Sequence, residues 1–173
     1  VVAGSIVLDL SRMRKIEVDI ENGVVLLEPG VGFYDLYDYL QSRNIPLWLS
    51  IPGNSWGSVI GNALDRGLGY TPYGEHTRNL CGMEVVLPDG DVVRTGMGAM
   101  PNAPTWNLHK YGFGPAWDQL FVQSNFGIVT KAGMWLMSQP ECVLGFDVEM
   151  EHMDDLGPLI DTIGPLDRKS TRL

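Results

Sequence analysis

The fold of this 173-residue chain depends on one stretch, GSVIGNALDRGLGYTPYGEH, which runs from Gly57 to His76. The region from residue 51 to residue 75, which overlaps this stretch, contains six glycines and two prolines. Only residues 60–65 have the composition of a short helix. A glycine-dense segment inside a globular chain is usually a place where the backbone approaches something closely. We therefore expect a binding site or a tightly packed turn here.

The junction at residues 57–62 predicts a loop that enters a helix, where free backbone N–H groups suit a phosphate or another anion. The Gly67-Leu68-Gly69 pattern is not a dinucleotide-binding fingerprint, because Pro72 stands where that motif needs a third glycine. The chain also lacks a Walker loop. Spacing alone favours a packed turn over an anion site, and it leaves both interpretations open.

Two β-hairpins flank this stretch in the sequence. Residues 16–20 and 24–27 alternate apolar and polar side chains around an Asn-Gly pair, and residues 83–87 and 92–95 surround an Asp-Gly pair. Such pairs between alternating runs are the strongest local signal for a hairpin. The remaining predicted elements are strands over residues 6–10, 128–137 and 144–150, helices over residues 35–40, 117–123 and 153–163, and a long loop over residues 96–114.

Composition limits the class of protein. Twenty-one glycines and eleven prolines favour an α+β fold with hairpins over a helical bundle. A formal net charge of −9 argues against nucleic acid as a partner, because the chain would repel a phosphate backbone. No apolar run approaches the roughly 20 residues that span a bilayer, so we expect no membrane association. Cys81 and Cys142 are too few for a disulfide framework and are interpreted as reduced thiols, although a single bridge remains open.

Few side chains suggest chemistry by their spacing. An acid–base role for Glu75 and His76 is conceivable, but hydrogen bonds that hold the loop are the favoured interpretation for such a pair. The chain has no His-x-x-x-His or Cys-x-x-Cys, so no metal site is expected. Cys81 is interpreted as a small buried residue. Among the tryptophans, Trp56 is the one whose place in the glycine-rich stretch suggests a cofactor contact.

Four stretches, in order along the chain, resemble the vanillyl-alcohol oxidase and p-cresol methylhydroxylase family of flavoenzymes. The resemblance extends from residue 6 to about residue 166. The stretches are GNALDRGLGYTPYGEH at 61–76, CGMEVVL at 81–87 with RTGMG at 94–98, YGFGP at 111–115, and QSNFGIVTK at 123–131 with WLM at 135–137.

The resemblance implies the second part of an FAD-binding domain with a mixed or antiparallel sheet and flanking helices, followed by a cap domain. We expect residues 1–140 to belong to the FAD-binding domain, residues 141–166 to open the cap, and residues 167–173 to be a non-native or disordered tail. Because the chain starts without Met, native sequence is expected upstream of Val1. The main pyrophosphate loop and the main catalytic residues then lie outside the chain, which would bind FAD weakly by itself and be inactive.

The implied cofactor is FAD, and the implied reaction is oxidation of a para-substituted phenol by hydride transfer to flavin N5 through a quinone methide. A cytochrome-type electron acceptor and an oligomeric full-length protein are also implied, whereas a cytoplasmic or periplasmic location stays open. Tyr70 is a possible catalytic residue. The implied cofactor-binding residues are Pro52, Gly53, Gly57, Ser58, Gly61, Asn62, Leu68, Gly69, Tyr70, Gly127, Ile128 and Val129.

One position departs from the family pattern. Vanillyl-alcohol oxidase has a functional Asp where this chain has Gly53, and no carboxylate lies between residues 51 and 64. This difference favours a hydroxylase or dehydrogenase over an oxidase. Two alternative functions remain open: an FAD-dependent oxidase of a sugar or hydroxy acid in the same superfamily, and a binding module without catalysis.

Overall fold

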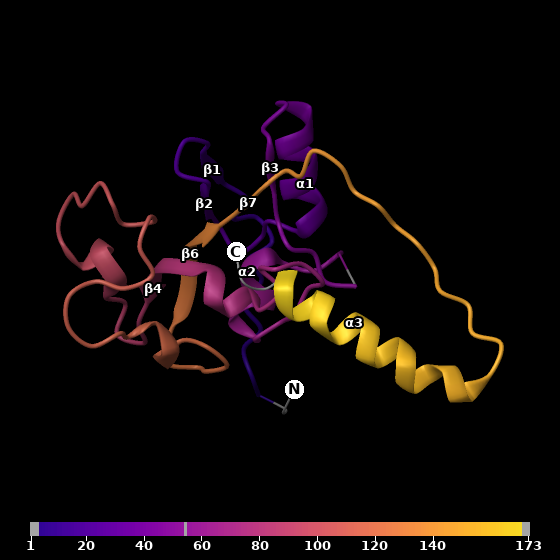
Figure 1. Cartoon of the computed structure of the whole chain (residues 1–173). Coiled ribbons are helices and arrows are strands. Elements are labelled where there is room, and N and C mark those ends of the chain that lie inside the picture. Colours follow the sequence, from indigo (N-terminus) through magenta and orange to yellow (C-terminus); the bar gives the residue numbers. More distant parts are fainter. Residues whose placement is uncertain (1–3, 54, 171–173) are drawn as a thin grey trace.

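The computed structural model describes residues 4–53 and 55–170, with side chains described as far as residue 165. In this part of the chain, the body is a five-stranded antiparallel sheet in the order β1-β2-β6-β4-β5, with helices alongside it (Figure 1). The predicted α+β fold is confirmed. The strands of this sheet are β1 (Ile16–Asp19), β2 (Val24–Leu27), β4 (Leu80–Val86), β5 (Val92–Arg94) and β6 (Ile128–Trp135).

Both predicted hairpins are confirmed, and each turns on its glycine. Gly23 between β1 and β2 has φ +63°, and Gly90 between β4 and β5 has φ +90°. These are left-handed conformations that side chains rarely adopt. The Asp19 carboxylate supports the first turn by accepting a hydrogen bond from the Asn22 backbone N–H at 3.1 Å.

Strand β6 lies in the middle of the sheet and joins the two hairpins. It pairs antiparallel with β2 on one side, where Val25 lies opposite Met134, and with β4 on the other, where Val85 lies opposite Val129. All four of these side chains are buried. The sheet is therefore complete only when a strand from late in the chain inserts between two early ones.

Two helices cover the core. Helix α1 (Phe33–Ser42) turns Phe33, Leu36 and Leu40 inward at helical spacing. Helix α2 (Val59–Leu64) buries three of its six residues. A second, two-stranded sheet pairs β3 (Leu47–Trp48) with β7 (Met137–Ser138). Short 3-10 helices complete the elements: η1 (His76–Asn79), η2 (Gly96–Ala99), η3 (Asp118–Leu120) and η4 (Met153–Asp155).

Three predicted elements are wrong. Residues 6–10 and 144–150 form no strand, because an extended segment needs hydrogen bonds from a neighbour and no described residue pairs with either segment. The predicted helix over residues 117–123 is only the single turn η3. Gln123 adopts φ +49°, which ends any helix there.

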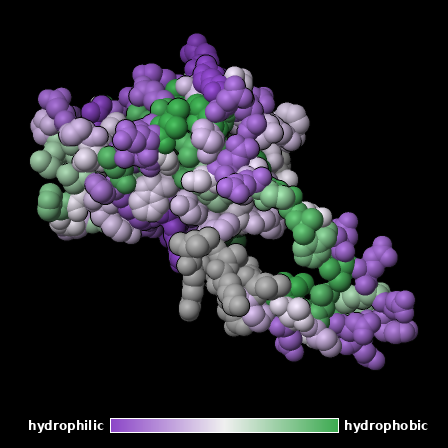
Figure 2. Space-filling model, turned by 45° about the horizontal axis from the view of Figure 1, so that its top comes forward, coloured by the Kyte–Doolittle hydropathy of each residue, from purple (hydrophilic) through white to green (hydrophobic). Residues whose placement is uncertain are grey.

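The chain beyond residue 140 projects from the body as an extended segment and then turns back as α3 (Leu156–Ser170) (Figure 1). Its hydrophobic side chains lie at the surface along this projection (Figure 2). Leu144 and Phe146, for example, are 82% and 75% exposed. Helix α3 includes residues 167–170, and the rest of the predicted tail, 171–173, lies outside the described residues. The predicted domain boundary at residue 140 stays a prediction.

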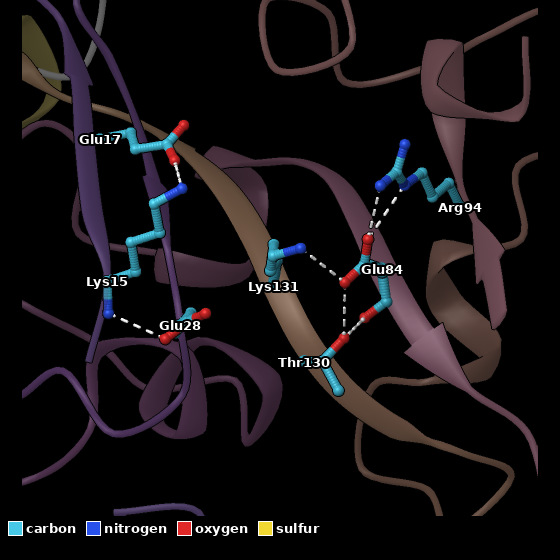
Figure 3. A network of polar contacts seen from close by, with 7 residues as sticks. All are labelled: Lys15, Glu17, Glu28, Glu84, Arg94, Thr130 and Lys131. Carbon is cyan, nitrogen blue, oxygen red and sulfur yellow. Dashed lines mark hydrogen bonds and ion pairs between the residues drawn. The ribbon is translucent and has the colours of Figure 1, made fainter. Parts of the chain in front are cut away.

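A buried carboxylate ties three strands together (Figure 3). Glu84 on β4 is 8% exposed and accepts hydrogen bonds from Arg94 on β5, at 3.0 and 2.8 Å, and from Lys131 on β6, at 2.9 Å. The Thr130 hydroxyl donates a further bond at 3.1 Å. Burial raises the pKa of Glu84, but these donors outweigh it, so its pKa lies below the ordinary value. By contrast, the carboxylate of Glu17 that pairs with Lys15 is half-exposed.

We predict that Glu84→Ala lowers the free energy of unfolding by about 1–3 kcal/mol, because two cations and a hydroxyl lose a buried acceptor. Glu17→Ala, which removes an exposed ion pair, should change it by less than about 1 kcal/mol. The Glu84 contribution is present above the unfolded-state pKa and is lost as the pH falls through the lowered folded-state pKa. Urea unfolding at pH 7 and at pH 3–4 measures both effects; equal losses for the two variants at pH 7 would contradict the assignment.

Candidate functional site

The glycine-rich stretch is attached to the sheet through Ser58. Its Oγ accepts a hydrogen bond from the Gly61 N–H at 2.9 Å and donates one to the Pro29 carbonyl at 2.6 Å. The Val59 N–H also donates to the Val31 carbonyl at 3.0 Å. Ser58 therefore caps α2 and at the same time fixes the start of this helix to the chain that leaves β2.

The next segment, residues 67–76, folds back on itself as a narrow loop. The Gly69 N–H donates to the Gly74 carbonyl at 2.7 Å, and the His76 N–H donates to the Gly67 carbonyl at 3.1 Å. Leu68 and Glu75 form an isolated antiparallel bridge between these bonds. The loop is thus held by its own backbone, with Leu68 at its surface.

Three polar side chains lie directly beneath the loop. His76 is 2% exposed, and its Nδ1 lies 2.5 Å from Asn62 Oδ1, so the predicted loop-holding role of His76 is confirmed. A Cβ on Gly67 would overlap the Asn62 amide, and one on Gly69 would overlap Ser50 Oγ and approach His76 Nε2 to 2.8 Å. The glycines are therefore required by close contact with protein side chains.

The electrostatics of this cluster favour neutral groups. Burial lowers the pKa of His76, so the ring stays uncharged at neutral pH. Its Nε2 and the Ser50 hydroxyl are buried and have no hydrogen-bond partner among the described residues. Cys81, the second residue of β4, is fully buried, and burial raises the pKa of its thiol to about 12. The prediction that Cys81 is a buried structural residue is confirmed, because a thiol with this pKa is not a nucleophile at neutral pH.

The outer face of the stretch is open and apolar. Trp56, Leu68 and Tyr70 are 84%, 67% and 90% exposed. A Cβ on Gly57 would meet nothing within 4 Å, and one on Gly53 would meet only the Tyr70 ring and hydroxyl, at ordinary contact distance. This face leaves space for a flat ligand. Tyr70 also borders an apolar cavity of about 230 Å³, whose other lining residues are Tyr37, Leu40, Gln41, Leu47, Trp48, Leu49, Ile51 and Thr71.

The second predicted contact segment, residues 127–129, has a different environment. A Cβ on Gly127 would lie 2.6 Å from Val85 Cγ1, so this glycine is needed for packing against β4. Val129 is buried in the core, whereas Ile128 is 41% exposed. No hydrogen bond or cavity formed by the described residues joins this segment to residues 52–70, and its role stays a prediction.

No group of three or more His, Cys, Asp or Glu side chains among the described residues is arranged to hold a metal ion. Within residues 4–53 and 55–170, no helix has the length and apolar character needed to cross a bilayer.

Residues 1–96 match the family model described as FAD binding domain. The chain belongs to this family. Its cofactor is therefore FAD, as the sequence resemblance implied. The open face over Gly53 and Gly57 fits this group, because it combines exposed aromatic side chains with space next to the backbone. The half-buried Asn62, whose amide lies against Gly67, offers a polar contact in the same stretch.

Individual relatives show which members of this family the chain resembles. The chain is 47% identical, over 97% of its length, to the 4-cresol dehydrogenase (hydroxylating) flavoprotein subunit of Pseudomonas putida. Among solved structures, p-cresol methylhydroxylase with substrate bound matches 92% of the chain at 48% identity and a TM-score of 0.85. The 4-ethylphenol oxidase of Gulosibacter chungangensis matches 90% at 42% identity and a TM-score of 0.83. The predicted resemblance to this flavoenzyme family is confirmed.

The chain spans about a third of the length of these relatives: 33% of the first, 31% of the second and 30% of the third. We refer to the chain extended to the length of these relatives as the full-length protein. One site residue was missed from the sequence: Ser50 belongs to no motif, and its closeness to Gly69 is visible only in three dimensions.

We predict that Gly69→Ala lowers the free energy of unfolding of the chain by about 1–3 kcal/mol, because the added methyl group overlaps the Ser50 hydroxyl and crowds His76. Gly57→Ala is the matched control. Its methyl group points into open space and should cost less than about 1 kcal/mol. Thermal and urea unfolding of both variants measure the difference, and equal stabilities would show that the loop is not packed as described.

Proposed function

We propose that the full-length protein is an FAD-dependent oxidoreductase that oxidises para-substituted phenols. The observation that carries this proposal is the similarity of nearly the whole chain to two relatives named for such phenols, 4-cresol and 4-ethylphenol. The exposed aromatic face around Tyr70 supports it, since a flavin ring and an aromatic substrate both favour flat apolar surfaces.

We propose the following roles for the described residues. When bound, FAD supplies the acceptor for a hydride that leaves the benzylic carbon of the phenolate. Ser58 and the backbone around Gly61 hold the entrance of α2 in place, and Asn62 offers an amide to the cofactor. The exposed side chains of Leu68 and Tyr70 would pack against the flavin ring and exclude water from one side of it. The substrate becomes a quinone methide on losing the hydride, and water then adds to it where a hydroxylated product forms.

The position of Gly53 supports an acceptor other than oxygen. Among the described residues other than its chain neighbours, no carboxylate lies within 4 Å of a Cβ at Gly53, and the nearest polar side-chain atom is the Tyr70 hydroxyl at 3.7 Å. The first relative is named a dehydrogenase and a flavoprotein subunit. We therefore propose that the reduced protein passes its electrons to a cytochrome-type partner.

We predict that 4-cresol or 4-ethylphenol reduces the flavin of the full-length protein under anaerobic conditions. The meta isomer, 3-cresol, should not, because its hydroxyl group cannot conjugate with the benzylic carbon to form a quinone methide. Stopped-flow loss of the visible flavin absorbance measures the reaction. If D-lactate or another hydroxy acid reduces the flavin and the para-substituted phenols do not, the proposed substrate class is wrong.

We predict that oxygen reoxidises the reduced full-length protein more slowly than a dye acceptor does, and that Gly53→Asp speeds the oxygen reaction. A gain of roughly tenfold corresponds to about 1.4 kcal/mol of activation free energy. Gly53→Asn has the same size without the charge and should leave the rate unchanged. Each variant is compared at equal FAD content. An unmodified protein that reacts with oxygen as fast as with the dye would contradict the proposed acceptor.

A further inference from the structure

The contact between His76 and Asn62 fixes the protonation of the histidine ring. The Asn62 Oδ1 lies 2.5 Å from His76 Nδ1, and an amide oxygen can only accept a hydrogen bond. The proton must therefore be on Nδ1. Because the ring is buried and neutral, Nε2 carries none and remains an acceptor.

The same contact orients the amide of Asn62. With Oδ1 directed to His76, the Nδ2 group points away from the ring, and it has no hydrogen-bond partner among the described residues. Asn62 is the fourth residue of α2 and is half-buried. The Nδ2 group lies against Gly67, the residue next to the exposed Leu68.

The surroundings leave little freedom for another arrangement. The Asn62 amide fills the space above the Cα of Gly67, and the His76 ring is held between Gly69 and the ring of Phe33, whose centroid lies 5.8 Å away. Ser50 Oγ occupies the remaining side, close to Gly69. A flipped amide would require the other neutral tautomer of His76, and the proton on Nε2 would then be buried without an acceptor among the described residues.

We infer that His76 is a positioning residue for the cofactor: it holds Asn62 so that the Asn62 amide nitrogen donates to an acceptor atom of FAD. This inference rests on the proposed function, in which the protein uses FAD. It adds how the protein orients one hydrogen-bond donor toward that cofactor. His76 itself does not touch FAD and acts only through Asn62. A purely structural histidine would stabilise the loop without affecting the direction of the amide.

The protonation can be tested without FAD. The chain contains only three histidines, His76, His109 and His152, so ¹⁵N labelling of histidine gives few ring signals. At pH 7 the signal lost in a His76→Gln variant should show a protonated Nδ1 and an unprotonated Nε2. The opposite tautomer, or a doubly protonated ring, would overturn the inference because the Asn62 amide would then have to be reversed.

The action through Asn62 is tested by a double-mutant cycle in the full-length apoprotein. FAD is titrated with the apoprotein, and the quenching of its fluorescence gives the dissociation constant of the initial FAD complex. Asn62→Ala should weaken binding about threefold to tenfold, the loss of one hydrogen bond. His76→Leu should weaken it by a similar factor, and the double variant should be no weaker than Asn62→Ala alone. Independent, multiplying effects would overturn the inference.

Two conservative variants separate donation from packing. His76→Gln keeps an N–H that can reach Asn62 Oδ1, so it should recover FAD affinity relative to His76→Leu. Asn62→Asp keeps the acceptor for His76 but loses the donor, so it should bind FAD at least as weakly as Asn62→Ala. Full affinity in Asn62→Asp would overturn the inference. Failure of the unmodified protein to bind FAD would instead count against the proposed function, and thermal unfolding identifies any variant that does not fold.

Discussion

The arrangement of the site depends on the absence of a side chain at two positions, Gly67 and Gly69. A Cβ at either one would occupy the space of a polar group, the Asn62 amide in the first case and the Ser50 hydroxyl in the second. Because both are glycines, the loop lies directly on these groups and on His76, and its outward residues are held against the body. The direction of Leu68 and Tyr70 follows from this contact, and so does the open face on which a cofactor can lie.

The sheet determines where this loop can be. The chain leaves β2, forms α1, β3, α2 and the loop, and returns as β4, while the strand between β2 and β4 in the sheet is β6 from much later in the sequence. The whole site is thus a connection between two strands that become neighbours of the same central strand only when β6 inserts. Buried pairs, Val25 with Met134 at the β2 end and Val85 with Val129 at the β4 end, then fix the two ends of that connection. The loop can be shaped by local contacts because its ends are held by long-range ones.

The sequence predicted an element correctly where neighbouring residues along the chain determine it. Both hairpins were predicted from their Asn-Gly and Asp-Gly turns, and α1 from the spacing of its apolar residues. Residues 6–10 and 144–150 were assigned to strands wrongly because a strand also needs a neighbour, and alternation along the chain does not report one. Ser50 was missed for the same reason, since its closeness to Gly69 arises from folding. The expected cofactor and substrate class came from the resemblance of whole motifs to a known family. The spacing of the glycines alone would have favoured a packed turn.

The Gly67-Leu68-Gly69 pattern forms a packed loop whose backbone donors are already used. A phosphate-binding loop needs free backbone N–H groups, yet here the Gly67 N–H donates to the Asn62 carbonyl at 2.8 Å and the Gly69 N–H donates to the Gly74 carbonyl at 2.7 Å. Neither donor is available to an anion. The formal charge of −9 also opposes a diphosphate. In the binding mode that we propose, Tyr70, Leu68 and the amide of Asn62 therefore contact the flavin part of FAD, and groups outside this loop meet the charge of the diphosphate.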